Sequence, residues 1–370
     1  MEFLKNCAYM LIKWFTRQRK PPFIFLAAGL GLLKLTGGFS WQVMLNFKNY
    51  GITASSPEGN FITSVLVPLL GIALCITGTV WAICGAITDW KRNARKRVLL
   101  IRGEGLRNVA RSSIDTQIKQ RFPGQLSHLD INITQNLRDG YVIQPAETFR
   151  NYVQPLSRNL VQHVGALAPG DTEIVYAGML PVPFLFWIGN VLDDKGPVVL
   201  YDWDRASESW QLISDDKPDD GDSFQHETTI KGSIEDVVIA VSFSYHADLS
   251  NIQRCFSGIR VEHLYLNHIN FNNHWSINKQ QRLSMQFIEF VKSLEAQGTK
   301  RIHLVLVAPS SVIVNFGRRY DSRNLPEIIV YQYEKSDADT YPWGIYALSH
   351  GREEGGFVLR VDALKKVANN

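Results

Sequence analysis

Two serines in the C-terminal part of the chain have the chemistry and the position to bind a phosphorylated ligand. Ser310 and Ser311 follow the apolar run 302–308 and begin a stretch with helical character. The free N–H groups at a helix N-terminus favour anions, and the two hydroxyl groups add further donors. The alternative is that the serines only cap the helix. The sequence thus predicts a contact to phosphate or base at this loop.

A second group of candidates follows another apolar run, 237–243. Ser244, Tyr245 and His246 stand directly after it. An aromatic side chain that stacks on a nucleobase contributes about 1–3 kcal/mol per base. Tyr245 is therefore a candidate stacking residue, whereas His246 is either a ligand contact or an ordinary surface histidine.

Four further candidates lie near the end of a predicted strand or on the helix that follows one: Pro183, Phe184, Trp203 and Arg318. A fifth, Trp343, lies in a Tyr-Pro-Trp run. Pro183 and Phe184 occupy the same place in the first half of the chain as the two serines do in the second, and the alternative for both is core packing. The two tryptophans suit stacking and core packing equally. The arginine suits phosphate pairing or a solvated helix face.

Several kinds of chemistry find no support. The sequence has no GxxxxGK[ST] motif and no GxSxG motif, which argues against these nucleotide-hydrolase and esterase sites. The four cysteines form no CxxC pair and the histidines have no metal-ligand spacing. We therefore expect no metal, no cofactor and no enzyme. The formal charge of +4 is mild, so no DNA or RNA polymer is expected as a partner.

The elements that position these residues alternate between strand and helix. Six apolar runs predict buried strands, at 174–180, 198–201, 237–243, 261–266, 302–308 and 328–331. Residues 278–297 predict a helix, because apolar side chains recur on one face, Asn278 can cap its start and Gly298 follows its end. Buried strands that alternate with helices indicate an α/β fold.

The strand and helix pattern occurs twice along the chain. The matching residues, 128 to 130 positions apart, are Gly170 and Gly298, Ile174 and Ile302, Pro181 and Pro309, Gly189 and Gly317, Pro197 and Pro326, Tyr201 and Tyr331, Trp203 and Tyr333, and Asp204 and Glu334. Two unrelated strand–helix–strand units are the alternative. We interpret the match as two Rossmann-like halves, with a ligand beyond the carboxyl ends of the strands.

The first 88 residues differ in character and predict two membrane spans, at about 23–43 and 61–87. Segment 61–87 has no charged residue and is long enough to cross a bilayer. Basic residues precede the first span and follow the second, so both termini are expected in the cytoplasm. Residues 1–20 predict a basic amphipathic helix on the membrane surface, and 89–100 a basic linker.

Small residues recur every seven positions along the second span, at Ser64, Gly71, Gly78 and Gly85. Small side chains on one face allow helices to approach closely in lipid, so this stripe predicts an oligomerisation face. Lys34 interrupts the first span. It lines a pore in an assembled state, or its amino group reaches toward the headgroups.

The C-terminal motifs also resemble a known family. The segments IHLVLVAPSSVIVNFGRRY, PEIIVYQYE and YPWGIYAL, within residues 302–348, look like the C-terminal half of a SAVED domain, which is similar to two fused CARF domains. The resemblance implies a SAVED domain at 101–370, with halves at about 101–245 and 246–370. Two transmembrane helices followed by such a domain resemble the membrane effectors of CBASS anti-phage systems.

The resemblance implies a function as well as a fold. Members of that family bind a cyclic tri- or tetranucleotide made by a partner nucleotidyltransferase, form homo-oligomers and disrupt the bacterial inner membrane, which causes abortive infection. The alternative is a membrane-anchored enzyme that cleaves a cyclic nucleotide.

Overall fold

The computed structural model describes residues 20–35, 65–105, 111–122, 124–164, 172–336, 339–347 and 356–368. The chain forms two compact units that divide after Arg95. The predicted amphipathic segment, the loop between the spans, Ser64 and Gly170 lie outside the described residues, as does the second part of the first predicted span.

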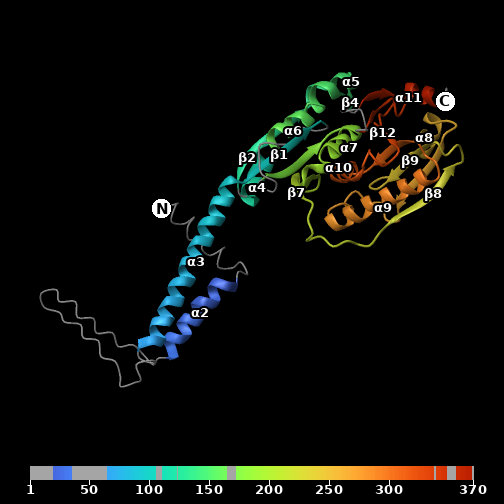
Figure 1. Cartoon of the computed structure of the whole chain (residues 1–370). Helices are drawn as coiled ribbons and strands as arrows, with labels where there is room; N and C mark the ends of the chain where they lie inside the picture. Colours follow the sequence, from blue (N-terminus) through green and yellow to red (C-terminus); the bar gives the residue numbers. More distant parts are fainter. Residues whose placement is uncertain are drawn as a thin grey trace. The chain divides into compact units, whose positions relative to one another are not determined.

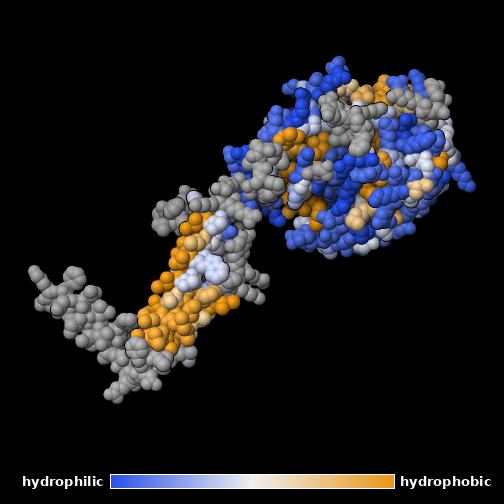
Figure 2. Space-filling model, in the orientation of Figure 1, coloured by the Kyte–Doolittle hydropathy of each residue, from blue (hydrophilic) through white to orange (hydrophobic). Residues whose placement is uncertain are grey.

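The described residues of the N-terminal unit form two apolar helices, α2 (Lys20–Leu35) and α3 (Val67–Arg95). Hydrophobic side chains cover much of their visible surface (Figure 2). Within α3, Val67–Trp90 has a mean hydropathy of 2.1 and is long enough to span a membrane. The apolar part of α2, Pro22–Lys34, is shorter than a span. The described residues thus contain one helix of spanning length, which coincides with the second predicted span.

Two glycines of the predicted oligomerisation stripe lie between α2 and α3 of the same chain. Gly71 and Gly78 are both buried. A Cβ atom at Gly71 would lie 3.0 Å from the carbonyl oxygen of Gly29 on α2, so the helices approach closely because no side chain intervenes. This part of the stripe therefore packs within one chain. Contacts between chains at Gly85 and the role of Lys34, which is exposed, stay predictions.

The first half of the C-terminal unit is built on a sheet with strand order β2-β1-β5-β6-β7. The first four strands in that order are parallel and β7 is antiparallel. The strands are β1 (Arg97–Glu104), β2 (Gln125–Asn132), β5 (Thr172–Met179), β6 (Val198–Asp204) and β7 (Ser209–Leu212). The helices are α4 (Arg111–Arg121), α5 (Pro145–Thr148), η3 (Phe149–Val153), α6 (Leu156–Val164) and α7 (Val182–Val191). Smaller elements are η2 (Thr134–Asn136), β3 (Leu137–Arg138), β4 (Tyr141–Val142) and η4 (Asp193–Lys195).

The second half has a larger sheet with the order β14-β13-β12-β11-β9-β10-β8. Its centre, from β12 to β10, is parallel, and the outer strands are antiparallel. The strands are β8 (Phe224–Ile230), β9 (Asp236–Ser242), β10 (Arg260–Leu266), β11 (Arg301–Val307), β12 (Glu327–Tyr331), β13 (Trp343–Tyr346) and β14 (Phe357–Leu359). The helices are α8 (Leu249–Cys255), α9 (Ile277–Ala296), α10 (Ser310–Arg319) and α11 (Arg360–Ala368).

The internal repeat corresponds to two equivalent strand–helix–strand units, β5–α7–β6 and β11–α10–β12. Pro181 and Pro309 occupy the N-cap positions of the two helices. The helices α7 and α10 lie side by side where the halves meet (Figure 1). α7 is buried along almost its whole length, which explains its apolar sequence without a membrane.

All six predicted strands form within two residues of their expected starts. Three details differ. α3 continues to Arg95 and β1 begins at Arg97, so segment 89–100 is helix and strand rather than linker. The two sheets divide in the connection between β7 and β8, earlier than residue 245. Ser276, not Asn278, caps the N-terminus of α9, and its Oγ accepts a hydrogen bond from the N–H of Lys279.

Candidate functional site

A cavity of about 580 Å³ lies at the carboxyl ends of the parallel strands of both halves. Its walls come from the segments that follow β5, β6, β9, β10, β11 and β12. Open α/β sheets bind their ligands at this edge, and the volume falls in the range of small-molecule sites. Because both halves line the same cavity, one ligand can contact both.

At this cavity, each half supplies a side chain that caps the N-terminus of a helix in the other half. The Asp202 carboxylate, from β6, accepts a hydrogen bond of 2.9 Å from the backbone N–H of Ser311 on α10. The Gln332 side-chain oxygen, directly after β12, accepts one of 3.0 Å from the N–H of Val182 on α7. Asp202 and Gln332 are 130 positions apart, as are Tyr201 and Tyr331 beside them, so the caps are equivalent and exchanged between halves.

This arrangement changes the expected role of the serine loop. The predicted contact of Ser310 and Ser311 to phosphate or base relied on free N–H groups at this helix end, but the N–H of Ser311 donates a hydrogen bond to the Asp202 carboxylate. The Ser311 side chain is fully buried, and its Oγ accepts a hydrogen bond of 2.9 Å from Gln280 Nε2. Ser310 does line the cavity. The loop is therefore at the site, but only its first serine faces the cavity.

Four other predicted residues line the same cavity: Trp203, Ser244, Tyr245 and His246. The remaining predicted residues do not line it: Pro183, Phe184, Arg318 and Trp343. Phe184 and Trp343 pack against each other with ring centroids 5.5 Å apart. Arg318 donates a hydrogen bond to the carbonyl oxygen of Gly196, so it supports the connection before β6.

Exposed aromatic side chains gather at the cavity. Tyr245, Phe271 and Tyr333 all line it, and their exposed fractions are 51%, 57% and 48%. They come from three different loops, after β9, β10 and β12. Exposed apolar side chains that gather in one patch mark interaction sites, and flat rings are suited to stacking on nucleobases.

A buried hydrogen-bond relay supports the loop that carries Tyr245. The Ser242 side chain, at the end of β9, accepts a hydrogen bond of 2.8 Å from the N–H of Ala247. Its Oγ lies 2.9 Å from His263 Nε2, and His263 Nδ1 lies 3.1 Å from a Glu227 carboxylate oxygen. Although this resembles a Ser–His–Glu triad, Ser242 is fully buried. The relay therefore fixes a loop and exposes no nucleophile to the cavity.

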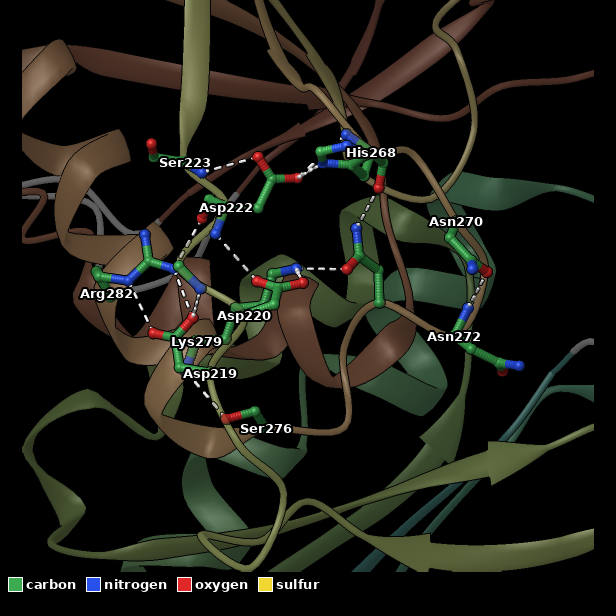
Figure 3. Close-up of polar contacts among 12 residues, drawn as sticks. Asp219, Asp220, Asp222, Ser223, His268, Asn270, Asn272, Ser276, Lys279 and Arg282 are labelled. Atoms are coloured by element: carbon green, nitrogen blue, oxygen red, sulfur yellow. Dashed lines mark hydrogen bonds and ion pairs between the residues drawn. The ribbon is translucent and has the colours of Figure 1, made fainter.

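The loop between β10 and α9 is held by an acidic segment between β7 and β8 (Figure 3). Arg282 on α9 makes two hydrogen bonds to the Asp219 carboxylate, of 2.8 and 2.6 Å. Lys279 is 2% exposed and binds both Asp220 and Asn273. These acidic residues therefore position the loop that supplies Phe271 to the cavity, rather than standing free in solvent.

The charges in the lining suit a nucleobase better than a buried phosphate. Asp202, Asp204 and Asp248 line the cavity, against one arginine, Arg205. A hydrogen bond from Ser207 lowers the pKa of Asp204, so it is ionised at neutral pH. Carboxylates accept N–H donors and repel phosphate. The interior of the cavity therefore suits N–H donors, and an anionic group is better placed near Arg205, which is exposed.

Some cavity residues were absent from the sequence prediction, among them Asp202, Phe271, His274 and Tyr333. The internal repeat contained a signal for two of them, because Trp203 and Tyr333 are equivalent and Asp202 precedes the tryptophan. Phe271 and His274 have no such signal. They lie on the loop between β10 and α9, outside the residues that match between the two halves, and only the folded chain brings them to the cavity.

Two Rossmann-like halves that share one cavity give the C-terminal unit the architecture of a ligand-binding sensor domain. Residues 156–346 match the family described as the SAVED, SMODS-associated and fused to various effectors sensor domain. This match covers more than half of the chain, so the chain belongs to the SAVED family. Residues 1–149 match the SAVED-fused 2TM effector domain. The predicted family is thereby confirmed. No curated protein matches the chain.

Solved structures with a similar fold include Cap4 SAVED/CARF-domain containing receptors. The Acinetobacter baumannii receptor with the cyclic trinucleotide 3'3'3'-cAAA has a TM-score of 0.48 and 13% identity, over 77% of this chain and 60% of that chain. The same receptor with 2'3'3'-cAAA has a TM-score of 0.45 and 13% identity, over 79% and 61%. For the Moraxella osloensis receptor the values are 0.43, 12%, 79% and 60%. The chain thus spans about three fifths of the length of these receptors.

Proposed function

We propose that this chain is a ligand-gated membrane effector of an anti-phage CBASS system. Its SAVED domain binds a cyclic tri- or tetranucleotide made by a partner nucleotidyltransferase. Binding drives homo-oligomerisation, and the N-terminal helices then disrupt the bacterial inner membrane, which they cross twice with both termini in the cytoplasm. Membership of the SAVED family and the match to a 2TM effector domain support this proposal.

The observation that carries the proposal is the cavity shared by the two halves, with three exposed aromatic side chains from separate loops. A cyclic oligonucleotide offers several bases around one ring, so several stacking surfaces around one cavity suit it. The carboxylates of Asp202, Asp204 and Asp248 in the lining would repel a ligand that places only phosphates inside the cavity. A ligand that contacts both halves also links its binding to the arrangement of the whole domain.

The proposal is tested with the full-length protein in nanodiscs. Calorimetry with cyclic di-, tri- and tetranucleotides measures binding, and light scattering in detergent measures assembly. We expect at least one cyclic tri- or tetranucleotide to bind and to increase the particle mass. Dye release from liposomes that contain the protein should then follow ligand addition.

Matched tyrosine variants locate the site. Tyr245→Ala removes a proposed stacking surface and should weaken binding by about 5- to 150-fold, which corresponds to 1–3 kcal/mol. Tyr152→Ala is the control, because Tyr152 is 43% exposed but does not line the cavity. Absence of binding across the panel would refute the sensor function, and binding without dye release would refute the effector function.

A further inference from the structure

His274 is a buried polar side chain of the cavity whose ring nitrogens make no hydrogen bond of normal geometry within the described residues. It lies on the loop between β10 and α9, lines the cavity and is 4% exposed. Its ring packs on Trp275 with centroids 4.2 Å apart. Among the residues that the structure describes, neither Nδ1 nor Nε2 makes a hydrogen bond of normal geometry, and the backbone of Phe271 on the same loop is close enough only to oppose the effect of burial on the pKa of the ring. Buried polar groups are rarely left unpaired in folded proteins, so a ligand is the natural partner of this ring.

A carboxylate from the other half lies opposite this ring. Asp202 Oδ2 is 3.7 Å from His274 Nε2, which is too long for a hydrogen bond. Asp202 is itself 4% exposed and lines the cavity. Its two oxygens accept backbone N–H groups of Trp203 and Ser311. Each carboxylate oxygen can accept a second hydrogen bond, so the pair has unused capacity that faces the cavity.

The protonation of the pair determines what it can bind. Burial lowers the pKa of His274, and the opposing effects of Asp202, the Phe271 backbone and Asp204 do not reverse this. The ring is therefore neutral at neutral pH, with one donor nitrogen and one acceptor nitrogen. The carboxylate accepts only. A complementary partner offers an N–H donor to the carboxylate and, beside it, an acceptor for the imidazole N–H.

We propose that Asp202 and His274 form a base-recognition subsite that binds the hydrogen-bonding edge of one nucleobase of the ligand. The amino edge of adenine has the required pattern, an exocyclic N–H donor next to a ring nitrogen acceptor. The proposal rests on the proposed sensor function and adds to it the residues that select the base. Because Asp202 belongs to the first half and His274 to the second, the bound base would join the halves.

The test compares two ligands that differ in one group. Cyclic tri- and tetraadenylate are measured against the same rings built from purine riboside, which lacks the exocyclic amino group. The full-length protein in nanodiscs should bind a cyclic adenylate on the order of 10- to 100-fold more tightly than its amino-free counterpart, because an unmatched buried acceptor remains. Equal binding of the two would overturn the subsite and leave the sensor function intact. If neither adenylate ring binds but another cyclic nucleotide of the panel does, the subsite proposal fails and the sensor function stands.

Variants of His274 give a second, independent readout. His274→Phe keeps a ring on Trp275 but has no nitrogen, and should weaken adenylate binding on the order of 10- to 100-fold. His274→Gln restores a donor and an acceptor and should recover part of that loss, which a purely structural role would not produce. His268→Phe is the control, because its side chain is 87% exposed and on the same loop but does not line the cavity. Wild-type affinity in His274→Phe would overturn the proposal.

Discussion

Gly189 on α7 and Gly317 on α10 pack backbone against backbone where the two halves of the sensor meet. A Cβ atom at Gly317 would lie 2.1 Å from the carbonyl oxygen of Phe186, and one at Gly189 would lie 2.3 Å from that of Val314. Both distances are shorter than any real contact, so only glycine permits this approach. The two glycines are also equivalent positions of the internal repeat, so equivalent helices of the two halves contact each other at equivalent residues.

Substitution of either glycine should therefore separate the halves. Gly317→Ala is expected to lower the free energy of unfolding by about 1–3 kcal/mol or more, because the added methyl group meets backbone that cannot rotate away. Chemical denaturation of the purified protein measures this change. Gly356→Ala is the control, since its nearest neighbour would lie 3.8 Å from the new Cβ atom. Equal stability of the two variants would show that the helices can move apart freely.

The exchanged helix caps should differ in strength. Asp202→Ala leaves the buried N–H of Ser311 without its charged acceptor and should cost about 1–3 kcal/mol of stability. Gln332→Ala removes a neutral acceptor from a less buried bond and should cost less. Thermal unfolding compares them, with Gln211→Ala at an exposed position as the control. A larger effect at Gln332 than at Asp202 would contradict this order.

The clamp on the cavity loop should weaken in acid. The two hydrogen bonds from Arg282 hold the pKa of Asp219 below its usual range. The stabilisation is therefore complete above the unfolded pKa of about 3.9, and it is lost as the pH falls through the lower folded pKa.

We expect Arg282→Gln to remove about 1 kcal/mol of stability at pH 7 and progressively less below about pH 4. Melting curves between pH 3 and pH 7 measure this. Lys300→Gln, which breaks an exposed pair with Glu235, should change stability little at any pH. A difference between Arg282→Gln and the wild type that stays constant down to pH 3 would refute the assignment.

Two glycines of α2 offer a matched test of the helix pair. A Cβ atom at Gly29 would lie 2.6 Å from Cys75 Sγ and 2.7 Å from the carbonyl oxygen of Gly71, whereas one at Gly31 would have no neighbour within 4 Å. Gly29→Ile should therefore abolish ligand-induced dye release without changing ligand affinity, because it separates α2 from α3. Gly31→Ile should retain both activities. Dye release from Gly29→Ile at the wild-type rate would show that this packing is dispensable.

The sequence predicted most of the scaffold and about half of the candidate site. Long apolar runs such as 302–308 form strands buried on both faces, and the local sequence alone is enough to predict such strands. β1 was missed because charged residues, such as Arg97 and Arg102, mix with its apolar core and continue the basic segment before it. Phe184 and Trp343 resembled ligand contacts until the fold showed them packed together across the two halves. The sequence around a residue does not show contacts of this kind, which join segments far apart in the chain.

The exchanged caps at Asp202 and Gln332 also determine how the duplicated unit can be divided. A chain severed between Leu212 and Phe224 would yield two fragments, each with a helix end whose acceptor belongs to the other. Neither fragment contains the acceptor that caps its own helix. We therefore expect the pieces to be poorly folded in isolation and to recover order only when mixed, as obligate complements rather than as interchangeable copies.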